Sequence, residues 1–271
     1  MSTWAKQLAD ITDTPRLEAE ILFKHISHYN DIDLIRNHDQ IITAEIISKV
    51  DTLIHTRLSG KPIAYIIEHR EFYGLDFKVN EHVLIPRPET ELLVDIALAH
   101  IQTHSVRTIL DLGTGSGAIA CTLAHHTQSA HITALDKSLA ALELAKENAE
   151  NLKLNNIEFH HSDWFEQVDN KHFDLIISNP PYVAENDIHL SQGDVRFEPD
   201  EALVALDHGM ADIQHIVAHA TEHLNQAGAL MIEHGYNQGA ATRTLFKQHA
   251  FHSIQTIQDL NHLDRLTLAY R

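Results

Sequence analysis

The sequence predicts an α/β fold in which a small helical domain precedes a doubly wound, Rossmann-like sheet. From Thr108 onward, short apolar runs rich in β-branched residues alternate with longer helical patterns, as in mostly parallel sheets covered on both faces. A glycine-rich turn, Gly113 to Gly117, follows the first of these runs and opens a helix. Residues 1 to 70 show only helical spacing of apolar residues.

Two helices are expected in the front domain. Thr14 caps the first helix, and Pro15 occupies its first position. Its apolar residues at helical spacing are Leu17, Ile21, Leu22 and Ile26. The second helix begins at Thr43 and ends before Gly60 and Pro62. One face of it carries Ile46, Ile47, Val50, Leu53, Ile54 and Leu58.

A β-hairpin is expected to link the two domains. Residues 71 to 84 are rich in aromatic and β-branched residues, and Gly74 and Asn80 favour turns. A proline-marked segment, Ile85 to Glu91, then leads into a helix. The expected organisation is a helical domain (1–70), a hairpin linker (71–84) and a sheet-containing domain (85–271).

Strands and helices alternate in the second domain. The expected strands are Thr108 to Leu112, His131 to Leu135, Ile157 to His160, Phe173 to Ser178 and Ala229 to Glu233. Helices are expected from about Gly117 and over Ser138 to Leu154. The last two segments, Phe251 to Gln258 and Leu263 to Tyr270, are expected to close the sheet as an antiparallel pair.

The composition limits the classes of function. The apolar share of 44% is that of an ordinary globular protein. No run approaches the ~18 apolar residues of a membrane span, and residues 1 to 10 lack the pattern of a signal peptide, so we expect a cytoplasmic protein without membrane association. A net charge of -18 disfavours nucleic acid as a partner and favours a basic protein. We expect a monomer.

Neither the single cysteine nor the 23 histidines indicate a metal or redox site. Cys121 lies among small apolar residues, which is typical of a buried helical side chain. His215, His219 and His223 have a spacing of four residues on a probable helix. The apolar stripe of that helix is Ile213, Ile216, Val217, Ala220 and Leu224, which would leave the three histidines on its flank or solvent face.

The loop from Asp111 to Gly117 predicts a nucleotide-like cofactor. Its glycines permit a tight turn and close approach of the backbone to a ligand. Asp136 ends the next strand, where a carboxylate can accept both hydroxyl protons of an adenosine ribose. After the third strand, Ser162-Asp163-Trp164 offers an aromatic and a polar residue to flank an adenine ring.

Two cofactor classes remain open at this point. Ala118 can occupy the sixth place of a dinucleotide fingerprint, as in a dehydrogenase. An acid two residues before the first glycine, Asp111, favours a methyltransferase, whose cofactor carries an amino acid and no pyrophosphate. Asp111 would shape the loop and accept from the cofactor's ammonium, directly or through water.

The segment Asn179-Pro180-Pro181-Tyr182 follows a predicted strand at its carboxyl end, where open α/β sheets bind ligands. The two prolines stiffen the loop, and Asn179 is restricted because it precedes a proline. The loop offers two acceptors, the Asn179 side-chain oxygen and the Pro180 carbonyl, beside the aromatic face of Tyr182. Such acceptors suit a planar NH₂ group, because they aim its nitrogen at a sulfonium methyl and strengthen as positive charge develops, without a general base.

Together these motifs resemble the protein-(glutamine-N5) methyltransferases of the HemK type, which modify class 1 peptide chain release factors. The likeness covers nearly the whole chain, through Pro62 to Ile66, Glu71 to Gly74, Ile85 to Glu91, Asp111 to Gly117 and Asn179 to Tyr182. Adenine-N6 DNA methyltransferases share the glycine loop and the catalytic loop. They lack the proline-arginine segment and the helical front domain.

The resemblance implies S-adenosyl-L-methionine as cofactor, S-adenosyl-L-homocysteine as product and a release factor as protein substrate. The cofactor residues expected are Asp111, Gly113, Thr114, Gly115, Ser116, Gly117, Asp136, Trp164 and Asn179. The residues expected to hold the glutamine of a Gly-Gly-Gln motif are Asn179, Pro180, Pro181 and Tyr182, with catalysis assigned to Asn179, Pro180 and Tyr182. Arg87 and Glu89 would help to build the wall of the active site, and the helical domain would recognise the substrate.

Other functions stay open from the sequence. A related subgroup modifies a glutamine of a ribosomal protein, and the motifs separate the two poorly. A nucleic-acid amino methyltransferase is disfavoured by the net charge, and a non-catalytic binding module is disfavoured by the intact loop from Asn179 to Tyr182.

Overall fold

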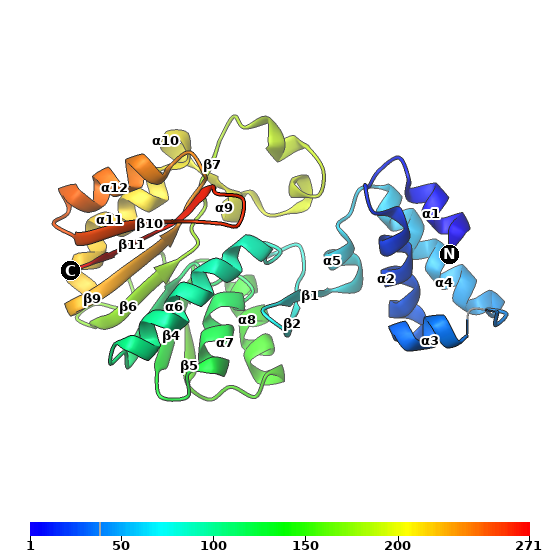
Figure 1. Ribbon diagram of the computed structural model, residues 1–271, viewed down its shortest axis with the longest axis horizontal. Coiled ribbons are helices and arrows are strands. Elements are labelled where there is room, and N and C mark those ends of the chain that lie inside the picture. Colours follow the sequence, from blue (N-terminus) through cyan, green and yellow to red (C-terminus); the bar gives the residue numbers. More distant parts are fainter. Residues whose placement is uncertain (38) are drawn as a thin grey trace. The chain divides into compact units, whose positions relative to one another are not determined.

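The computed structural model describes residues 1–37 and 39–271. The chain forms two compact units, Met1–His69 with His189–Phe197, and Arg70–Ile188 with Glu198–Arg271 (Figure 1). The segment His189–Phe197 is thus grouped with the helical unit, although it follows the predicted catalytic loop, Asn179 to Tyr182, in sequence. The domain limits at residues 70 and 84 stay a prediction.

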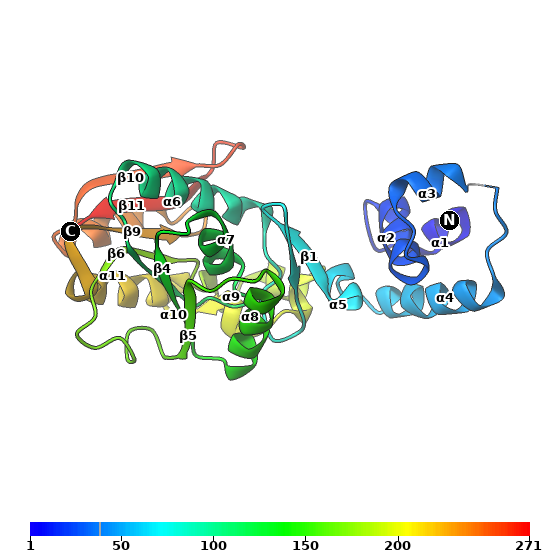
Figure 2. The ribbon, with the colours of Figure 1, turned by 90° about the horizontal axis from the view of Figure 1, so that it is seen from below.

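The first unit is built from helices packed around one apolar core (Figure 2). Its elements are α1 (Ser2–Leu8), α2 (Pro15–Ser27), α3 (Asp31–Arg36), α4 (Ala44–Leu58) and α5 (Ile63–Ile67), with the short turns η2 (Ile188–Ser191) and η3 (Val195–Phe197) at its second segment. Thr43 caps α4 as predicted, since its hydroxyl accepts from the N–H of Ile46 at 3.4 Å. Trp4, Leu8, Leu22, Val50 and Ile54 are among the core residues.

The predicted apolar face of α2 is wrong at Leu17, which is 53% exposed. The buried face consists of Ala19, Leu22 and Phe23. Leu17 lies two residues before Ala19, about 200° around the helix from it, and therefore faces away. On α4, the predicted face residues Ile47 and Leu58 are likewise exposed, at 40% and 38%.

A buried arginine ties the two segments of the first unit together. The Arg57 side chain is 5% exposed and donates to Glu18 Oε2 at 2.8 Å and to Asp194 Oδ1 at 2.9 Å. Its Nη1 also donates to the carbonyls of Gly60 and Lys61, both at 3.2 Å. The segment that follows the catalytic loop is therefore held to the helices by an ion pair with little solvent around the guanidinium.

A hairpin opens the second unit. It consists of β1 (His69–Phe72) and β2 (Leu75–Lys78). Tyr73 and Gly74, in the turn, have positive φ angles of 54° and 74°, as a two-residue turn between twisted strands requires. A hairpin is thus present from His69 to Lys78, whereas its role as a linker over residues 71 to 84 stays a prediction.

The second unit contains a seven-stranded sheet with the order β10-β11-β9-β6-β3-β4-β5. These strands are β3 (Thr108–Leu112), β4 (His131–Asp136), β5 (Ile157–His161), β6 (Phe173–Ser178), β9 (Leu224–Glu233), β10 (His252–Gln258) and β11 (Asp264–Tyr270). Neighbouring strands from β5 to β9 pair in parallel, while β11 pairs antiparallel with β9 and β10 with β11. The predicted doubly wound sheet with a closing antiparallel pair is confirmed.

The remaining elements surround this sheet. The longer helices are α6 (Glu91–Thr103), α7 (Ala118–His126), α8 (Leu139–Asn151), α11 (Ala211–His223) and α12 (Gly239–Gln248). The short elements are η1 (Pro88–Thr90), β7 (Val183–Ala184), α9 (Asp200–Leu203), β8 (Val204–Ala205) and α10 (Leu206–Gly209). Within the described residues, no helix is both long and apolar enough to cross a membrane.

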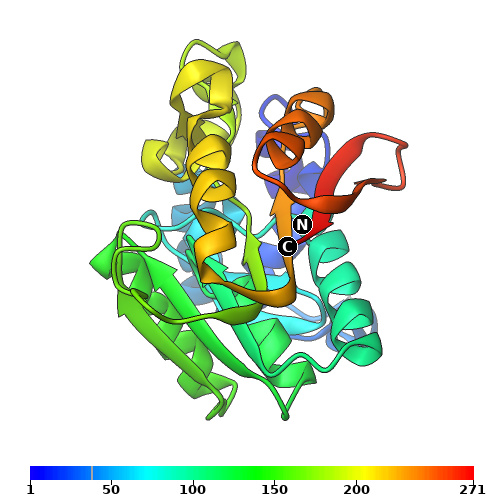
Figure 3. The same ribbon diagram turned by 90° about the vertical axis from the view of Figure 1, so that its left-hand side faces the viewer.

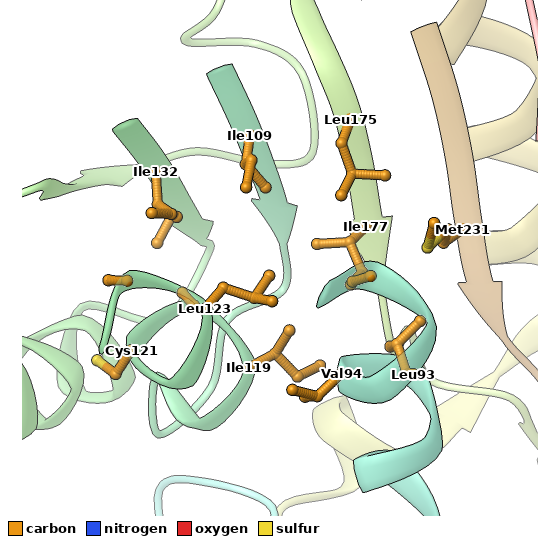
Figure 4. Close-up of a cluster of buried hydrophobic side chains, with 14 of the residues drawn as sticks. Leu93, Val94, Ile109, Ile119, Cys121, Leu123, Ile132, Leu175, Ile177 and Met231 are labelled. Atoms are coloured by element: carbon orange, nitrogen blue, oxygen red, sulfur yellow. The ribbon is translucent and has the colours of Figure 1, made fainter. Parts of the chain in front are cut away.

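Helices cover both faces of the sheet, because its strands are apolar on both sides (Figure 3). On one face, Leu93 of α6 and Leu123 of α7 pack against strand residues such as Ile109 and Ile177 (Figure 4). On the other face, the next residue along the strand, such as Leu110, belongs to a second core with α11 and α12. This alternation follows from the period of two along a strand.

The prediction for the histidines of α11 holds for His215 and His219, which are exposed, and is wrong for His223. The His223 side chain is 9% exposed, and its ring stacks on Phe165 with centroids 4.7 Å apart. It lies one turn after buried Ala220 and extends the apolar stripe. Among the described residues, no group of three His, Cys, Asp or Glu side chains could hold a metal ion.

Candidate active site

A cavity of about 330 Å³ lies at the carboxyl ends of the parallel strands, within the range of small-molecule sites. Each strand from β3 to β6 contributes to its wall through the residues that follow it. The predicted site residues that line it are Arg87, Gly113, Thr114, Gly115, Ser116, Asp136, Trp164, Asn179 and Pro181. Predicted site residues up to 94 positions apart, from Arg87 to Pro181, thus meet in one place.

The glycine loop after β3 is held by hydrogen bonds to the next strand. The N–H groups of Gly113 and Thr114 both donate to the carbonyl of Leu135 at 2.9 Å. Gly113, Gly115 and Gly117 have φ angles of 73°, 55° and 80°, where a side chain would be strained. Gly117 does not line the cavity. A Cβ there would lie 3.1 Å from Cys121 Sγ, so this glycine permits close packing of the loop on α7 and α8.

Asp136 closes the far side of this loop. Its Oδ2 accepts from the N–H of Gly115 and its Oδ1 from the N–H of Ser138, each at 2.8 Å. Burial raises the pKa of the Asp136 carboxyl, although both hydrogen bonds act in the opposite direction. The carboxylate is therefore fixed in orientation and keeps lone pairs for a ligand with two hydroxyl groups, such as a ribose.

Asp111 lies beneath the loop, fully buried, and does not line the cavity. By distance and angle neither of its carboxylate oxygens makes a hydrogen bond within residues 1–37 and 39–271, although the Thr114 hydroxyl and the Ala120 N–H lie close enough to act against the rise of its pKa. Burial raises its pKa to about 7, and the charge of Asp136 adds to the shift. A buried, unpaired carboxylate is costly, so this position favours a cationic or hydrogen-bonding ligand group nearby.

Trp164 follows β5 and stands over the start of the glycine loop. A Cβ at Gly113 would lie 3.7 Å from Trp164 Cζ3. The backbone of Trp164 has a positive φ of 46°, which is uncommon for an aromatic residue, and the Ser162 hydroxyl donates to its carbonyl at 2.8 Å. The indole is thereby fixed beside the cavity, where a planar ring could stack.

The predicted catalytic loop, Asn179 to Tyr182, begins directly after β6. The Asn179 Nδ2 donates to the hydroxyl of Thr90 at 3.2 Å. Its Oδ1 is buried and has no partner among the described residues, and Asn179 lines the cavity. Because buried acceptors are almost always satisfied in proteins, this oxygen is the strongest indication of a missing N–H donor.

The rest of the loop is anchored by its backbone. The carbonyl of Tyr182 accepts from Gln238 Nε2 at 3.0 Å. A Cβ at Gly209, whose φ is 84°, would lie 2.2 Å from that carbonyl oxygen, so only glycine fits there. Pro181 lines the cavity, whereas Pro180 is buried and Tyr182 packs against the second core. Burial and the nearby charge of Glu233 raise the pKa of Tyr182.

Arg87 and Glu89 differ in their placement. Arg87 lines the cavity, and its Nη2 bonds Glu198 Oε1 at 2.5 Å. Glu198 is buried, and its Oε2 accepts from the N–H of Ile85 at 3.3 Å. Glu89 is exposed and does not line the cavity. The guanidinium is therefore a fixed part of the wall, while the Glu89 side chain lies outside it.

Sequence analysis missed two buried residues at this site, Thr90 and Glu233. The Thr90 hydroxyl donates to Glu233 Oε1 at 3.2 Å and accepts from Asn179. Burial raises the pKa of Glu233 to about 7. Glu233 could have been noticed as an acid ending an otherwise apolar strand, as Asp136 does. Thr90 gives no such signal, because its partners are distant in sequence.

Two family models match the chain. Residues 90–197 match the model described as Methyltransferase small domain, and residues 1–67 match the model described as PrmC N-terminal domain. The first spans the glycine loop and the catalytic loop, and the second spans the helices of the first unit.

Two similar relatives have the same name, release factor glutamine methyltransferase. The chain is 43% identical over 258 residues to the release factor glutamine methyltransferase of Aliivibrio fischeri, covering 95% of this chain and 90% of the relative. It is 43% identical over 257 residues to the release factor glutamine methyltransferase of Escherichia coli (strain K12), covering 95% and 92%.

Solved structures agree on the fold. A methyltransferase from Pyrococcus furiosus has a TM-score of 0.54 at 18% identity and covers 82% of this chain and 98% of that one. A T. thermophilus 16S rRNA methyltransferase in complex with AdoMet and guanosine has a TM-score of 0.54 at 21% identity and covers 75% and 49%. At such identities the likeness concerns the arrangement of strands and helices alone.

Proposed function

The chain belongs to the release factor glutamine methyltransferase family, and from that premise we propose its reaction in detail. It transfers a methyl group from S-adenosyl-L-methionine to the side-chain nitrogen, N5, of the glutamine in the Gly-Gly-Gln motif of class 1 peptide chain release factors. The observation that carries this proposal is the buried Asn179 Oδ1, which has no partner among the described residues and belongs to a side chain that lines the cavity.

The cavity residues fit the cofactor at each of its chemical parts. The Asp136 carboxylate would accept from the ribose hydroxyls, and the Trp164 ring would stack on the adenine. Asp111, buried and unpaired within the described part of the chain, would interact with the ammonium through the loop above it. When bound, the cofactor supplies an electrophilic methyl on a sulfonium that is itself a good leaving group.

The catalytic loop would act on the amide of the substrate. Asn179 Oδ1 and the Pro180 carbonyl would each accept one N–H of the glutamine NH₂ and so aim its nitrogen. An amide N–H is too weakly acidic for a side chain to deprotonate it first, so hydrogen bonds that strengthen as positive charge grows on nitrogen are the suitable device. Positioning supplies much of the remaining acceleration, since effective molarities can reach ~10⁵ M or more.

The choice of substrate would depend on a second contact outside this loop. The net charge of -18 favours a basic protein over nucleic acid. The first unit has helix caps and an apolar core, and its described residues include no group of three His, Cys, Asp or Glu side chains that could hold a metal ion. We assign it to recognition of the release factor, together with the segment 189–197 that it holds.

One experiment tests this function directly. The protein is incubated with methyl-labelled S-adenosyl-L-methionine and, in separate reactions, a release factor, its Gly-Gly-Gln to Gly-Gly-Ala variant, a ribosomal protein substrate and DNA. Label should enter only the unmodified release factor, on the glutamine. Preferential labelling of DNA, or of the ribosomal protein glutamine, would assign a different substrate.

A further inference from the structure

We propose that Thr90 and Glu233 are positioning residues that hold the Asn179 amide in the orientation which leaves Oδ1 free for the substrate. The proposal rests on the proposed function, because it assigns these two residues a role in presenting the acceptor that the methyl transfer needs. All three residues belong to the second unit and come from η1, β9 and the end of β6.

The three side chains form one directional chain of hydrogen bonds. Asn179 Nδ2 donates to Thr90 Oγ1 at 3.2 Å, and Thr90 Oγ1 donates to Glu233 Oε1 at 3.2 Å. Thr90 is 4% exposed and Glu233 is 3% exposed, so water does not readily replace either bond. Buried hydrogen bonds of this kind hold their members in place, although Glu233 Oε2 itself makes no hydrogen bond among the described residues.

The direction of the chain decides which end of the Asn179 amide faces Thr90. A hydroxyl has one proton, and an ionised carboxylate only accepts. When Glu233 accepts the hydrogen bond from the Thr90 hydroxyl, Thr90 can only accept a hydrogen bond from Asn179. It therefore binds the NH₂ end of the amide and leaves the oxygen end unpaired. A flipped amide would place a donor against the NH₂ of the target glutamine, and two donors repel.

The protonation of Glu233 should therefore control this selection. Burial raises its pKa to about 7, opposed by the hydrogen bond from Thr90 and the charge of Arg265. The other titratable groups that act on it are Glu89 and Tyr182. Protonated Glu233 could itself donate to Thr90, which would free the Thr90 proton to bond Asn179 Oδ1. The amide would then lose its preferred orientation as the pH falls.

The first test compares variants of Thr90. Thr90→Val keeps the shape of the side chain and removes the hydroxyl, and it should lower kcat about 10-fold while the dissociation constant for S-adenosyl-L-methionine stays within about 2-fold. Thr90→Ser restores the hydroxyl and should recover most of the rate. Thr127→Val is the matched control, because it too removes a buried threonine hydroxyl. This hydroxyl lies at the end of α7 and donates to the carbonyl of Leu123.

A double-mutant cycle then tests whether Thr90 acts through Asn179. Adding Thr90→Val to Asn179→Ala should cost less than about 2-fold beyond Asn179→Ala alone, because the amide to be oriented is gone. Independent, multiplicative losses would overturn the proposal. So would a Thr90→Val variant whose cofactor affinity falls as much as its kcat, since Thr90 would then bind the cofactor itself.

The pH profile tests Glu233. At saturating cofactor, wild-type kcat should fall as the pH is lowered from 8 to 6, and Glu233→Gln should show no fall in this range. A Glu233→Gln variant whose kcat falls with pH in the same way as that of the wild type would contradict the proposal. The failure of the proposed function and the failure of the positioning role can be distinguished. An active Asn179→Ala enzyme would contradict the proposed methyl-transfer mechanism. An inactive Asn179→Ala enzyme together with a fully active Thr90→Val enzyme would contradict only the positioning role.

Discussion

The carboxylate of Asp136 accepts a hydrogen bond from the N–H of Gly115 at 2.8 Å, so the residue that ends β4 also shapes the glycine loop after β3. One side chain thus joins two elements that we propose to bind the cofactor, and the bonded residues are separated by 21 positions in sequence. A change at Asp136 should therefore affect both the ligand contact and the loop that surrounds it.

Replacing Asp136 by alanine should weaken binding of S-adenosyl-L-methionine by roughly 1.5 to 3 kcal/mol, the scale of hydrogen bonds to a charged group. Isothermal titration calorimetry measures this directly, with the thermal unfolding midpoint as a check on folding. Affinity equal to that of the wild type would remove Asp136 from the cofactor site.

Replacing Asn179 by alanine should lower single-turnover rates by about 10² to 10³, as for the loss of one preorganised hydrogen bond in a transition state. Cofactor affinity should change little, because the lost contact is to the substrate amide. Asn225→Ala is a suitable control, since Asn225 is also partly buried and donates one side-chain hydrogen bond, to Asp174. Rates within a few-fold of wild type would contradict the assigned chemistry.

Asp111 should make the free protein less stable as the pH rises. Burial raises its folded-state pKa to about 7 from the ordinary value of 3.8, so between these values the folded state binds the proton more tightly than the unfolded state. Its contribution is present below about pH 4 and is lost as the pH rises to about 7, with an upper limit of ~4 kcal/mol. Urea unfolding at pH 5 and pH 8 should show a smaller difference for Asp111→Asn. The exposed Asp10→Asn should behave as wild type.

Removing the Arg57 guanidinium should destabilise the first unit. Arg57→Met leaves the nearly buried Glu18 without its partner, and breaking one side of a buried ion pair costs about 3 to 5 kcal/mol. Arg16→Met removes an exposed pair with Glu20 and should cost less than about 1 kcal/mol. Denaturant unfolding followed at Trp4 measures the free energy of unfolding of Arg57→Met and Arg16→Met. Equal losses in the two variants would show that burial of the Arg57 ion pair adds nothing to stability.

Deleting residues 1 to 75 should raise the KM for release factor far more than it weakens cofactor binding. The deletion removes the helices of the proposed recognition unit, among them the Arg57 partner of Asp194, and also strand β1 of the second unit. For the intact enzyme, kcat/KM should fall as salt rises, because an acidic surface attracts a basic protein mainly over long range. Normal methylation of release factor by the truncated chain would refute the recognition role.

The sequence was most informative where the local pattern alone decides the structure. The limits of β3 and β6 were predicted to the residue, because each is an apolar run between polar or turn residues. Asp136 and the loop that starts at Asn179 could be placed at one edge of the sheet in advance because they follow such strands, and both contribute to the cavity. The predictions for Leu17 and His223 are wrong, because a few apolar residues at helical spacing do not determine exactly which side of a helix is buried.

The positioning residues could not be predicted in the same way. Thr90 and Glu233 are 143 positions apart, and Arg57 and Asp194 are 137 apart. Their pairing depends on the tertiary arrangement that brings η1 to the end of β9 and the segment 189–197 to α4. No periodicity or motif within a short window contains that information.

The proline after Asn179 also affects how readily Asn179 deamidates. An asparagine deamidates most readily when the backbone N–H of the next residue gives up its proton and its nitrogen attacks the side-chain carbonyl, and Pro180 has no such N–H. Were Asn179 to become aspartate, a negative charge would replace the amide beside Thr90, close to the buried Glu233. The ring of Pro180 that stiffens the loop therefore also blocks this route of deamidation at Asn179.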